Sequence, residues 1–267
     1  PTRRSSDLRW KTMNQPEIEF EHVVKRFGQT TVIPDLSFTI NKGEFVTVLG
    51  ASGSGKTTTL KMINGLWQPT SGTVKIGGKK LTEHNQVDLR RHIGYVVQQI
   101  ALFPHLTIKQ NIAVVPKLLG WEQAKIDQRV DELLDLVKLP SDQYADRYPA
   151  QLSGGQQQRV GLARALAANP DFILFDEPLG ALDALTRIDL QKEIKNLHAS
   201  LADKTFFFVT HDINEALYLG QRVMVMNRGR LEQFASPETI VQHPASPFVE
   251  ELLATEERNQ ELWRRLQ

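Results

Sequence analysis

Residues 50–57 read Gly-Ala-Ser-Gly-Ser-Gly-Lys-Thr, and this spacing of glycine, lysine and threonine is typical of a loop that binds phosphate. Glycines at these positions allow backbone N–H groups to wrap around a triphosphate. Lys56 would reach the outer phosphates, and the hydroxyl of Thr57 would reach Mg²⁺. The pattern therefore predicts a triphosphate-binding site that includes Gly50, Ser52, Gly53, Ser54, Gly55, Lys56, Thr57 and Thr58.

The segments on either side of this loop predict a strand and a helix. Residues 44–49 are nearly all apolar and include β-branched side chains, as in a parallel strand buried on both faces. Residues 57–64 end at Gly65, which stands where a helix C-cap is expected. The loop would then open a helix whose N-terminal dipole faces the anion, a context that a glycine-rich surface turn does not provide.

An acidic pair follows a second apolar run, and it is a candidate for the hydrolytic step. Asp176 and Glu177 come directly after residues 172–175, at the carboxyl end of a predicted buried strand, where open α/β sheets bind their ligands. Asp176 would orient Mg²⁺ through its water shell, and Glu177 would position or deprotonate water. The alternative is that the pair caps a helix that begins at Pro178.

A histidine ends a third apolar run, residues 206–210. At the carboxyl end of that predicted strand, His211 would donate a hydrogen bond to the γ-phosphate, although a lone histidine is also commonly structural. Asp212 and Glu215 fit a helix N-cap followed by an acid at the third helical position, so Asp212 needs no catalytic role.

The segment Leu152-Ser153-Gly154-Gly155-Gln156 indicates which kind of phosphate-loop NTPase the chain is. Ser153 is placed to cap a helix that runs to about Ala168, and the two glycines allow a phosphate to approach its N-terminus. With these motifs in this order, the chain resembles the ATP-binding subunits of ABC transporters. The resemblance implies that two copies enclose each ATP between the phosphate loop of one copy and Ser153, Gly154, Gly155 and Gln156 of the other.

The resemblance covers residues 17–248 and implies further site residues. Phe27 takes the place of an aromatic ring that stacks on adenine, although one aromatic near a turn is also commonly part of a core. Gln98 takes the place of a glutamine that contacts Mg²⁺ and the attacking water, so the implied metal set is Thr57, Gln98 and Asp176. Residues 180–183, ending at Asp183, resemble a loop through which the two copies sense each other.

Within the family, residues 95–105 and 112–121 are most similar to ATPases that import glycine betaine, choline and related osmoprotectants. This resemblance implies two transmembrane permease subunits that contact the segment Gln99–His105, a solute-binding protein that acts indirectly, and a peripheral location on the cytoplasmic face of the cell membrane. Many such ATPases carry a pair of regulatory domains after the cassette, and we expect none in the segment 250–267.

Composition limits the other function classes. The 267 residues carry a formal charge of +1 with basic residues spread along the chain, so we expect no nucleic-acid partner. The longest apolar runs have the length of strands rather than membrane spans. Because the chain contains no cysteine, disulfides and thiolate sites are excluded.

These patterns predict an α/β fold with a phosphate-loop (RecA-like), mostly parallel sheet as its core. Alternation in residues 18–21 and 36–40 predicts an antiparallel β subdomain, and a helical face at Val130, Leu133, Leu134 and Val137 predicts an inserted helical subdomain over about residues 98–164. The expected divisions are a disordered leader or sequence artefact over 1–12, the ABC ATPase domain over 13–249, and a tail helix over 250–267.

The resulting interpretation is an ATP-hydrolysing importer subunit that dimerises around two Mg·ATP, with an osmoprotectant as its solute. Two alternatives are an importer for another small solute, such as an amino acid, and a soluble ABC-type ATPase of translation or DNA repair. Those soluble types usually carry a double cassette or a long coiled coil, and we expect neither in this chain. A nucleotide-dependent module without hydrolysis would not need Glu177, Gln98 and His211 together.

Overall fold

A computed structural model describes residues 16–98 and 101–265. The expected leader over 1–12, and Gln99 and Ile100 at the start of the expected permease-contacting segment, lie outside the described residues. The chain divides into two compact units: unit one contains residues up to His84 and from Thr205 onward, and unit two contains Asn85–Lys204.

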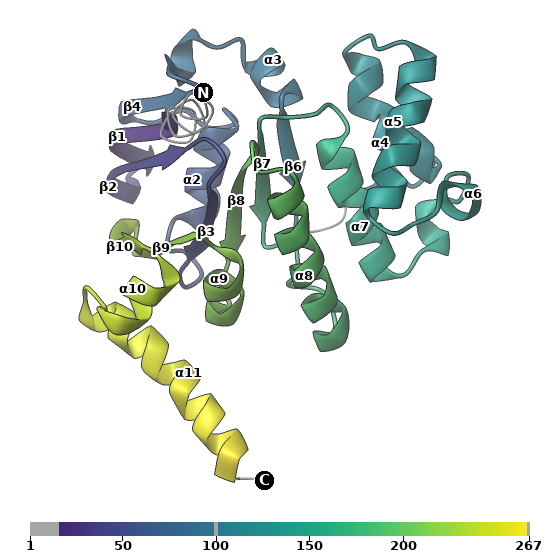
Figure 1. Cartoon of the computed structure of the whole chain (residues 1–267). Coiled ribbons are helices and arrows are strands. Elements are labelled where there is room, and N and C mark those ends of the chain that lie inside the picture. The colour runs from purple at the N-terminus through teal and green to yellow at the C-terminus, as the bar shows by residue number, and fades with distance from the viewer. Residues whose placement is uncertain (1–15, 99–100, 266–267) are drawn as a thin grey trace, which may run out of the picture. The chain divides into compact units, whose positions relative to one another are not determined.

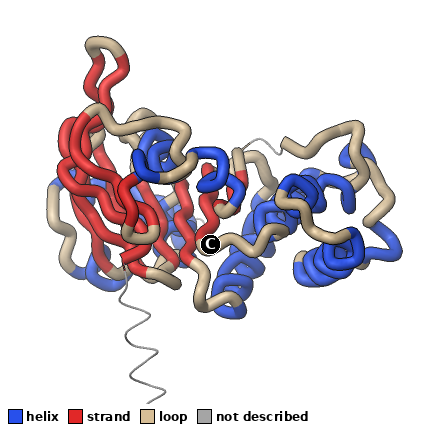
Figure 2. The backbone as a smooth tube through the Cα atoms, turned by 90° about the horizontal axis from the view of Figure 1, so that it is seen from above, coloured by secondary structure: helices blue, strands red, loops and turns tan. Residues whose placement is uncertain are grey.

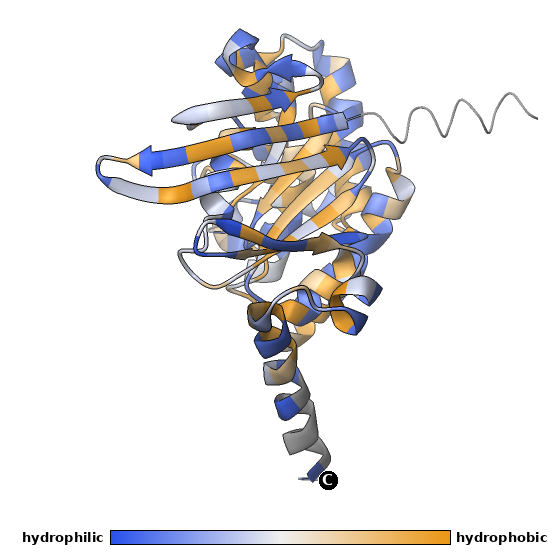
Figure 3. Cartoon of the chain, turned by 90° about the vertical axis from the view of Figure 1, so that its left-hand side faces the viewer, coloured by the Kyte–Doolittle hydropathy of each residue, from blue (hydrophilic) through white to orange (hydrophobic). Residues whose placement is uncertain are grey.

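The antiparallel sheet of unit one has the strand order β2-β1-β4-β5. Its strands are β1 (Pro16–Phe27), β2 (Thr30–Asn41), β4 (Ser71–Ile76) and β5 (Lys79–Lys80). Figure 3 shows β1 and β2 as a long hairpin on which apolar and polar residues alternate. The predicted alternation is confirmed, because Ile18 and Phe20 are buried and Phe20 stacks on Phe38 of β2 with ring centroids 4.5 Å apart.

The second group of strands in unit one has the order β10-β9-β3-β8. Its members are β3 (Phe45–Leu49), β8 (Thr205–Thr210), β9 (Arg222–Asn227) and β10 (Arg230–Ala235). β3 runs parallel to both β8 and β9, whereas β10 pairs with β9 in antiparallel fashion. Every side chain of β3 and β8 is buried, as the continuous apolar runs of these segments predicted.

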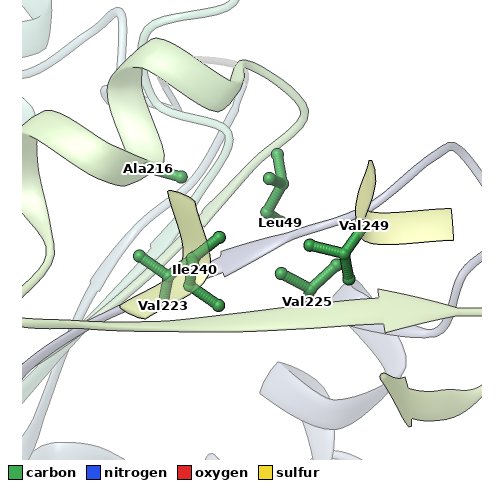
Figure 4. Packing of buried hydrophobic residues seen from close by; sticks show 6 residues of the cluster. All are labelled: Leu49, Ala216, Val223, Val225, Ile240 and Val249. Carbon is green, nitrogen blue, oxygen red and sulfur yellow. The ribbon is translucent and has the colours of Figure 1, made fainter. Parts of the chain in front are cut away.

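Helices cover an apolar cluster at one end of unit one. The helical elements of the unit are α2 (Lys56–Ile63), η1 (Leu81–Glu83), α9 (Ile213–Leu219), α10 (Pro237–Gln242) and α11 (Pro247–Arg265). Six side chains from β3, β9, α9, α10 and α11 meet in this cluster: Leu49, Ala216, Val223, Val225, Ile240 and Val249 (Figure 4). Burying a side chain such as Leu or Ile contributes about 1.5–3 kcal/mol, so α10 and the start of α11 are anchored to the strands.

Unit two consists mostly of helices, as the blue segments of Figure 2 show. Helices α4, α5 and α7 pack together (Figure 1), and the predicted face of α5 is buried at Val130, Leu133 and Leu134. Two parallel strands, β6 and β7, pair in the same unit. The elements of unit two are α3 (Gln86–Arg91), β6 (Ile93–Val96), α4 (Ile108–Leu118), α5 (Gln123–Leu136), α6 (Ser141–Tyr144), η2 (Pro149–Gln151), α7 (Gly154–Leu166), β7 (Phe172–Asp176) and α8 (Ala184–Ser200).

Helix ends differ from the predicted ends by a few residues. The helix that Ser153 caps stops at Leu166, two residues short of the predicted end, and Asn169 beyond it is left-handed with φ of 53°. Such a conformation cannot continue a right-handed helix. In the described part of the chain, no helix combines the length and apolar character that a membrane crossing requires.

Candidate functional site

The phosphate-binding loop of unit one connects β3 to α2. Gly53 and Gly55 have φ of 78° and 100°, a region that glycine enters without the steric cost of a Cβ. Gly55 is the N-cap of α2, and Thr59 donates both its backbone N–H and its hydroxyl to the Gly55 carbonyl, at 2.9 and 3.0 Å. The loop therefore turns sharply into the helix, with its backbone N–H groups at the helix N-terminus, where an anion is favoured.

Two polar side chains of this loop, those of Lys56 and Ser54, are buried. The Lys56 ammonium donates hydrogen bonds to the carbonyls of Gly50 at 2.7 Å and Ala51 at 3.1 Å, and the side chain is buried. Ser54 is also buried, and its hydroxyl oxygen has no hydrogen-bond partner within the structure. A buried hydroxyl without a partner is costly, so this loop suits a ligand that supplies acceptor atoms.

The turn between β9 and β10, which lies outside the predicted motifs, contacts the same loop. Gly229, in the turn between β9 and β10, donates its N–H to the Ser54 carbonyl at 3.0 Å. An added Cβ on Gly229 would lie 1.9 Å from the Val32 carbonyl oxygen, so only glycine fits there. The sequence signal for the turn is the run Asn227-Arg228-Gly229 after an apolar strand, but its contact with the loop depends on the fold.

His211 directly follows β8. It lies beside the phosphate loop because Leu49 and Thr210, the last residues of the parallel strands β3 and β8, are paired. The next residue, Asp212, caps α9 by accepting from the N–H groups of Asn214 and Glu215, as predicted. Glu215 is the acid at the third helical position, as predicted. Its buried carboxylate accepts a 2.7 Å hydrogen bond from the Thr210 hydroxyl, and Asp212 N–H donates to that same hydroxyl at 3.0 Å.

Phe27 ends β1 and has 40% of its surface exposed. Its ring contacts the Trp67 ring edge to face, and the centroids are 4.8 Å apart. The exposed surface favours stacking on a ligand over the alternative of core packing. Sequence reasoning did not include Trp67, which belongs to no phosphate-binding motif.

In unit two, the register of β6 and β7 brings Gln98 and the acidic pair to the same sheet edge. Val96 pairs with Phe175, so the residues that follow both strands emerge together. The Tyr95 hydroxyl donates to the Asp176 carboxylate at 3.2 Å, and the Tyr95 pKa is raised, chiefly by burial and also by that charge. Glu177 has a left-handed φ of 48°, which is rare outside glycine.

The helix-cap alternative for this acidic pair is wrong. Asp176 is the last residue of β7, and the next helix, α8, begins only at Ala184. The cap of α8 is Asp183, whose carboxylate accepts from Thr186 N–H at 3.0 Å. This hydrogen bonding from Thr186 is the main reason that the Asp183 pKa is lowered.

Ser153 and Gln156 form a reciprocal cap at the start of α7, as the sequence predicted for Ser153. The Ser153 hydroxyl accepts from Gln156 N–H at 3.3 Å, and the Gln156 side chain accepts from Ser153 N–H at 2.9 Å. Ser153 and Gly154 are exposed, so this helix end is open to a ligand. A Cβ on Gly155 would lie 2.6 Å from Thr186 Cγ2, so a side chain there would require Thr186 to shift.

The candidate residues thus form one set in each unit. Unit one holds an anion-binding loop that leads into α2 with Lys56 and Thr57, His211 directly after the strand that pairs with β3, and Phe27 at the end of β1. Unit two holds Gln98, Asp176 and Glu177 at one sheet edge, and the capped N-terminus of α7. Chemically, the first set can bind a polyphosphate and the second can supply oxygen ligands, a base and a second anion-binding helix end.

Comparison with known proteins places the chain in a family. The family described as ABC transporter matches residues 33–180. The carnitine transport ATP-binding protein OpuCA of Listeria monocytogenes is 52% identical over 237 residues, which are 88% of this chain and 59% of that protein. The glycine betaine/carnitine/choline transport ATP-binding protein OpuCA of Bacillus subtilis is 50% identical over 240 residues, which are 90% of this chain and 63% of that protein.

The chain therefore spans about three fifths of the length of these two relatives. Among solved structures, the ATP-binding cassette MJ0796, described as a dimeric post-hydrolysis state bound to ADP and Pi, is 36% identical with a TM-score of 0.72. The match covers 82% of this chain and 98% of that structure. From its motifs, its fold and these matches, the chain belongs to the ABC transporter family.

Proposed function

We propose that this chain is the ATP-hydrolysing subunit of an importer, which dimerises around two Mg·ATP and drives uptake of an osmoprotectant such as glycine betaine or choline. The observation that carries the proposal is the phosphate loop between β3 and α2, with left-handed glycines, the buried Lys56 ammonium and the partnerless Ser54 hydroxyl. The transport functions in the names of the two relatives support the importer and its solute class.

In unit one, Lys56 and the backbone N–H groups of residues 53–58 bind the phosphates. The ammonium can exchange the carbonyls of Gly50 and Ala51 for phosphate oxygens, which form stronger, charge-assisted hydrogen bonds. His211 donates a hydrogen bond to the γ-phosphate, and Phe27 stacks on the adenine base. The register of Leu49 with Thr210 supports the placement of His211 beside the loop.

Thr57 and Gln98 would hold Mg²⁺ through their side-chain oxygens, and Asp176 would orient it through its water shell. These groups suit Mg²⁺ because that ion prefers hard oxygen ligands and retains water. When bound, Mg²⁺ neutralises charge that develops on the phosphates. Glu177 orients the attacking water and accepts its proton. The hydrogen bond from Tyr95 holds the Asp176 carboxylate at the edge of β7.

The open N-terminus of α7 supports a site that two copies share. Ser153, Gly154, Gly155 and Gln156 of one copy bind the γ-phosphate held by the other copy, and Asp183 lies where the copies contact each other. The dimeric description of the related ATP-binding cassette supports this arrangement. The capping hydrogen bonds between Gln156 and Ser153 support it further, because they hold both residues at the start of α7.

A cavity of about 340 Å³ in unit two supports a permease partner. Ala101 and Phe103 line this cavity, and both lie within the segment 99–105 that the resemblance assigned to permease contact. Its wall combines apolar side chains with three arginines, a surface suited to an amphipathic segment that ends in an acidic group. The lining includes Arg90, Arg91, Ile93, Val114, Val115 and Arg164. Binding there would place the chain at the cytoplasmic face of a membrane.

Uptake by cells tests the importer and its solute. Deleting the gene should abolish uptake of radiolabelled glycine betaine or choline, and the parent gene should restore it. Copurification of the chain with two membrane subunits should accompany this result. Loss of uptake of an amino acid with normal uptake of quaternary amines would assign another solute. A chain that hydrolyses ATP without any membrane partner would support the soluble alternative.

A further inference from the structure

Trp67 occupies a position beside Phe27 that the proposed ATP site does not explain. Trp67 lies in the loop between α2 and β4, and its ring plane makes an angle of 72° with the Phe27 ring. A lysine ammonium lies over each ring: Lys25 Nζ is 4.7 Å from the Phe27 centroid, and Lys61 Nζ is 4.7 Å from the Trp67 centroid. The two rings and two ammonium groups form one cluster within unit one.

Hydrogen bonds fix the Trp67 loop at both ends. At the first end, Trp67 N–H donates to the carbonyl of Lys61, in the last turn of α2, at 2.9 Å. At the other end, Lys25 Nζ donates to the Gln68 carbonyl at 2.7 Å, and Thr70 N–H donates to the Val24 carbonyl at 2.8 Å. The loop therefore connects the helix that begins at the phosphate loop with the strand that carries Phe27.

Phe27 itself lies directly before the two-residue turn of the β1–β2 hairpin. Gly28 in this turn has φ of 58° and no atom within 4 Å of its would-be Cβ. An exposed aromatic side chain loses rotamer freedom when a ligand immobilises it. An edge-to-face contact with a fixed ring reduces that loss, because it holds the side chain in one rotamer beforehand.

We propose that Trp67 is a positioning residue for the nucleotide base: it holds the Phe27 ring so that one face remains available for stacking. The inference rests on the proposed function. It predicts that Trp67 affects binding of the base of a nucleoside triphosphate and does not affect binding of its phosphates.

Two probes separate base recognition from phosphate binding: ATP, and inorganic tripolyphosphate, which has no base. Trp67→Ala should weaken ATP binding roughly threefold to tenfold, measured by calorimetry, and should leave tripolyphosphate binding unchanged. Trp67→Phe should restore most of the ATP affinity. Trp121→Ala is the matched control, because Lys125 lies 4.0 Å over the Trp121 ring in unit two, and it should alter neither affinity.

A double-mutant cycle tests whether Trp67 acts through Phe27. Adding Trp67→Ala to Phe27→Ala should cause little further loss of ATP affinity. Equal losses for ATP and tripolyphosphate in Trp67→Ala, or an unchanged ATP affinity, would overturn the positioning role while leaving the proposed ATPase intact. If the parent protein binds neither probe, both proposals fail. If circular dichroism shows that Trp67→Ala does not fold, Trp67→Leu is used in its place, because leucine keeps apolar volume without the aromatic ring.

Discussion

At the scale of single residues, Glu177 combines an unusual backbone with a placement suited to catalysis. Its φ of 48° costs a residue other than glycine about 1–2 kcal/mol, and it follows the buried strand β7. We predict that Glu177→Gln retains ATP binding and lowers the turnover rate about 10²- to 10⁴-fold, because the amide cannot accept a proton from water. A steady-state ATPase assay measures this change.

The control for Glu177 is Asp171→Asn, which removes an exposed carboxylate just before the opposite end of the same strand, 3.9 Å from Lys204. Turnover should remain within about twofold of the parent rate, since surface charge changes have small effects. Parent-like hydrolysis by Glu177→Gln would remove Glu177 from the catalytic role.

Phe27 allows a second prediction at this scale. Phe27→Ala should weaken ATP binding several-fold, because aromatic stacking contributes about 1 kcal/mol, and the maximal rate should remain near normal. Phe27→Tyr keeps the ring and should bind ATP as the parent does. Titration with ATP followed by initial rates at saturation gives both quantities. If Phe27→Ala binds ATP with the parent affinity, the core-packing alternative is supported.

At the scale of elements, the β9–β10 turn supports the phosphate loop and admits only glycine at position 229. In Gly229→Ala, the Cβ would lie 1.9 Å from the Val32 carbonyl oxygen at a residue with φ of 77°. Strain and overpacking together should lower the free energy of unfolding by about 3 kcal/mol or more. Urea denaturation measures this loss.

Gly28→Ala is the matched control for the turn, because Gly28 also has a positive φ, of 58°, but an added Cβ meets no atom within 4 Å. Gly28→Ala should lower the free energy of unfolding only by the backbone strain of about 1 kcal/mol. Equal losses in the two variants would mean that the contact with Val32 is relieved by a small shift of the turn, and that the turn does not constrain the loop.

At the scale of the whole molecule, the proposed function requires two copies. Glu177→Gln should form a dimer when ATP and Mg²⁺ are added, because slow hydrolysis prolongs the state in which the phosphate loop of one copy faces Ser153 of the other. Sedimentation velocity should show the increase in mass. Adding Ser153→Arg should abolish the dimer by crowding the γ-phosphate. A double variant that still dimerises with ATP would exclude Ser153 from the shared site.

Local chemistry made much of the fold predictable from the sequence. The apolar runs at β3, β7 and β8 are buried strands, and the caps at Ser153 and Asp212 begin helices as expected, since capping depends on residues a few positions apart. Helix ends were less predictable, because a left-handed residue such as Asn169 ends a helix through backbone geometry that many sequences can adopt.

The sequence by itself determined the phosphate loop, its flanking strand and helix, and the order of the motifs, because these depend on residue types at fixed short spacings. Only the tertiary structure decided which distant residues meet. The pairing of Leu49 with Thr210, the contact of Gly229 with Ser54, and that of Trp67 with Phe27 join residues 161, 175 and 40 positions apart. Such contacts depend on how the packed elements share one core, which no local pattern specifies.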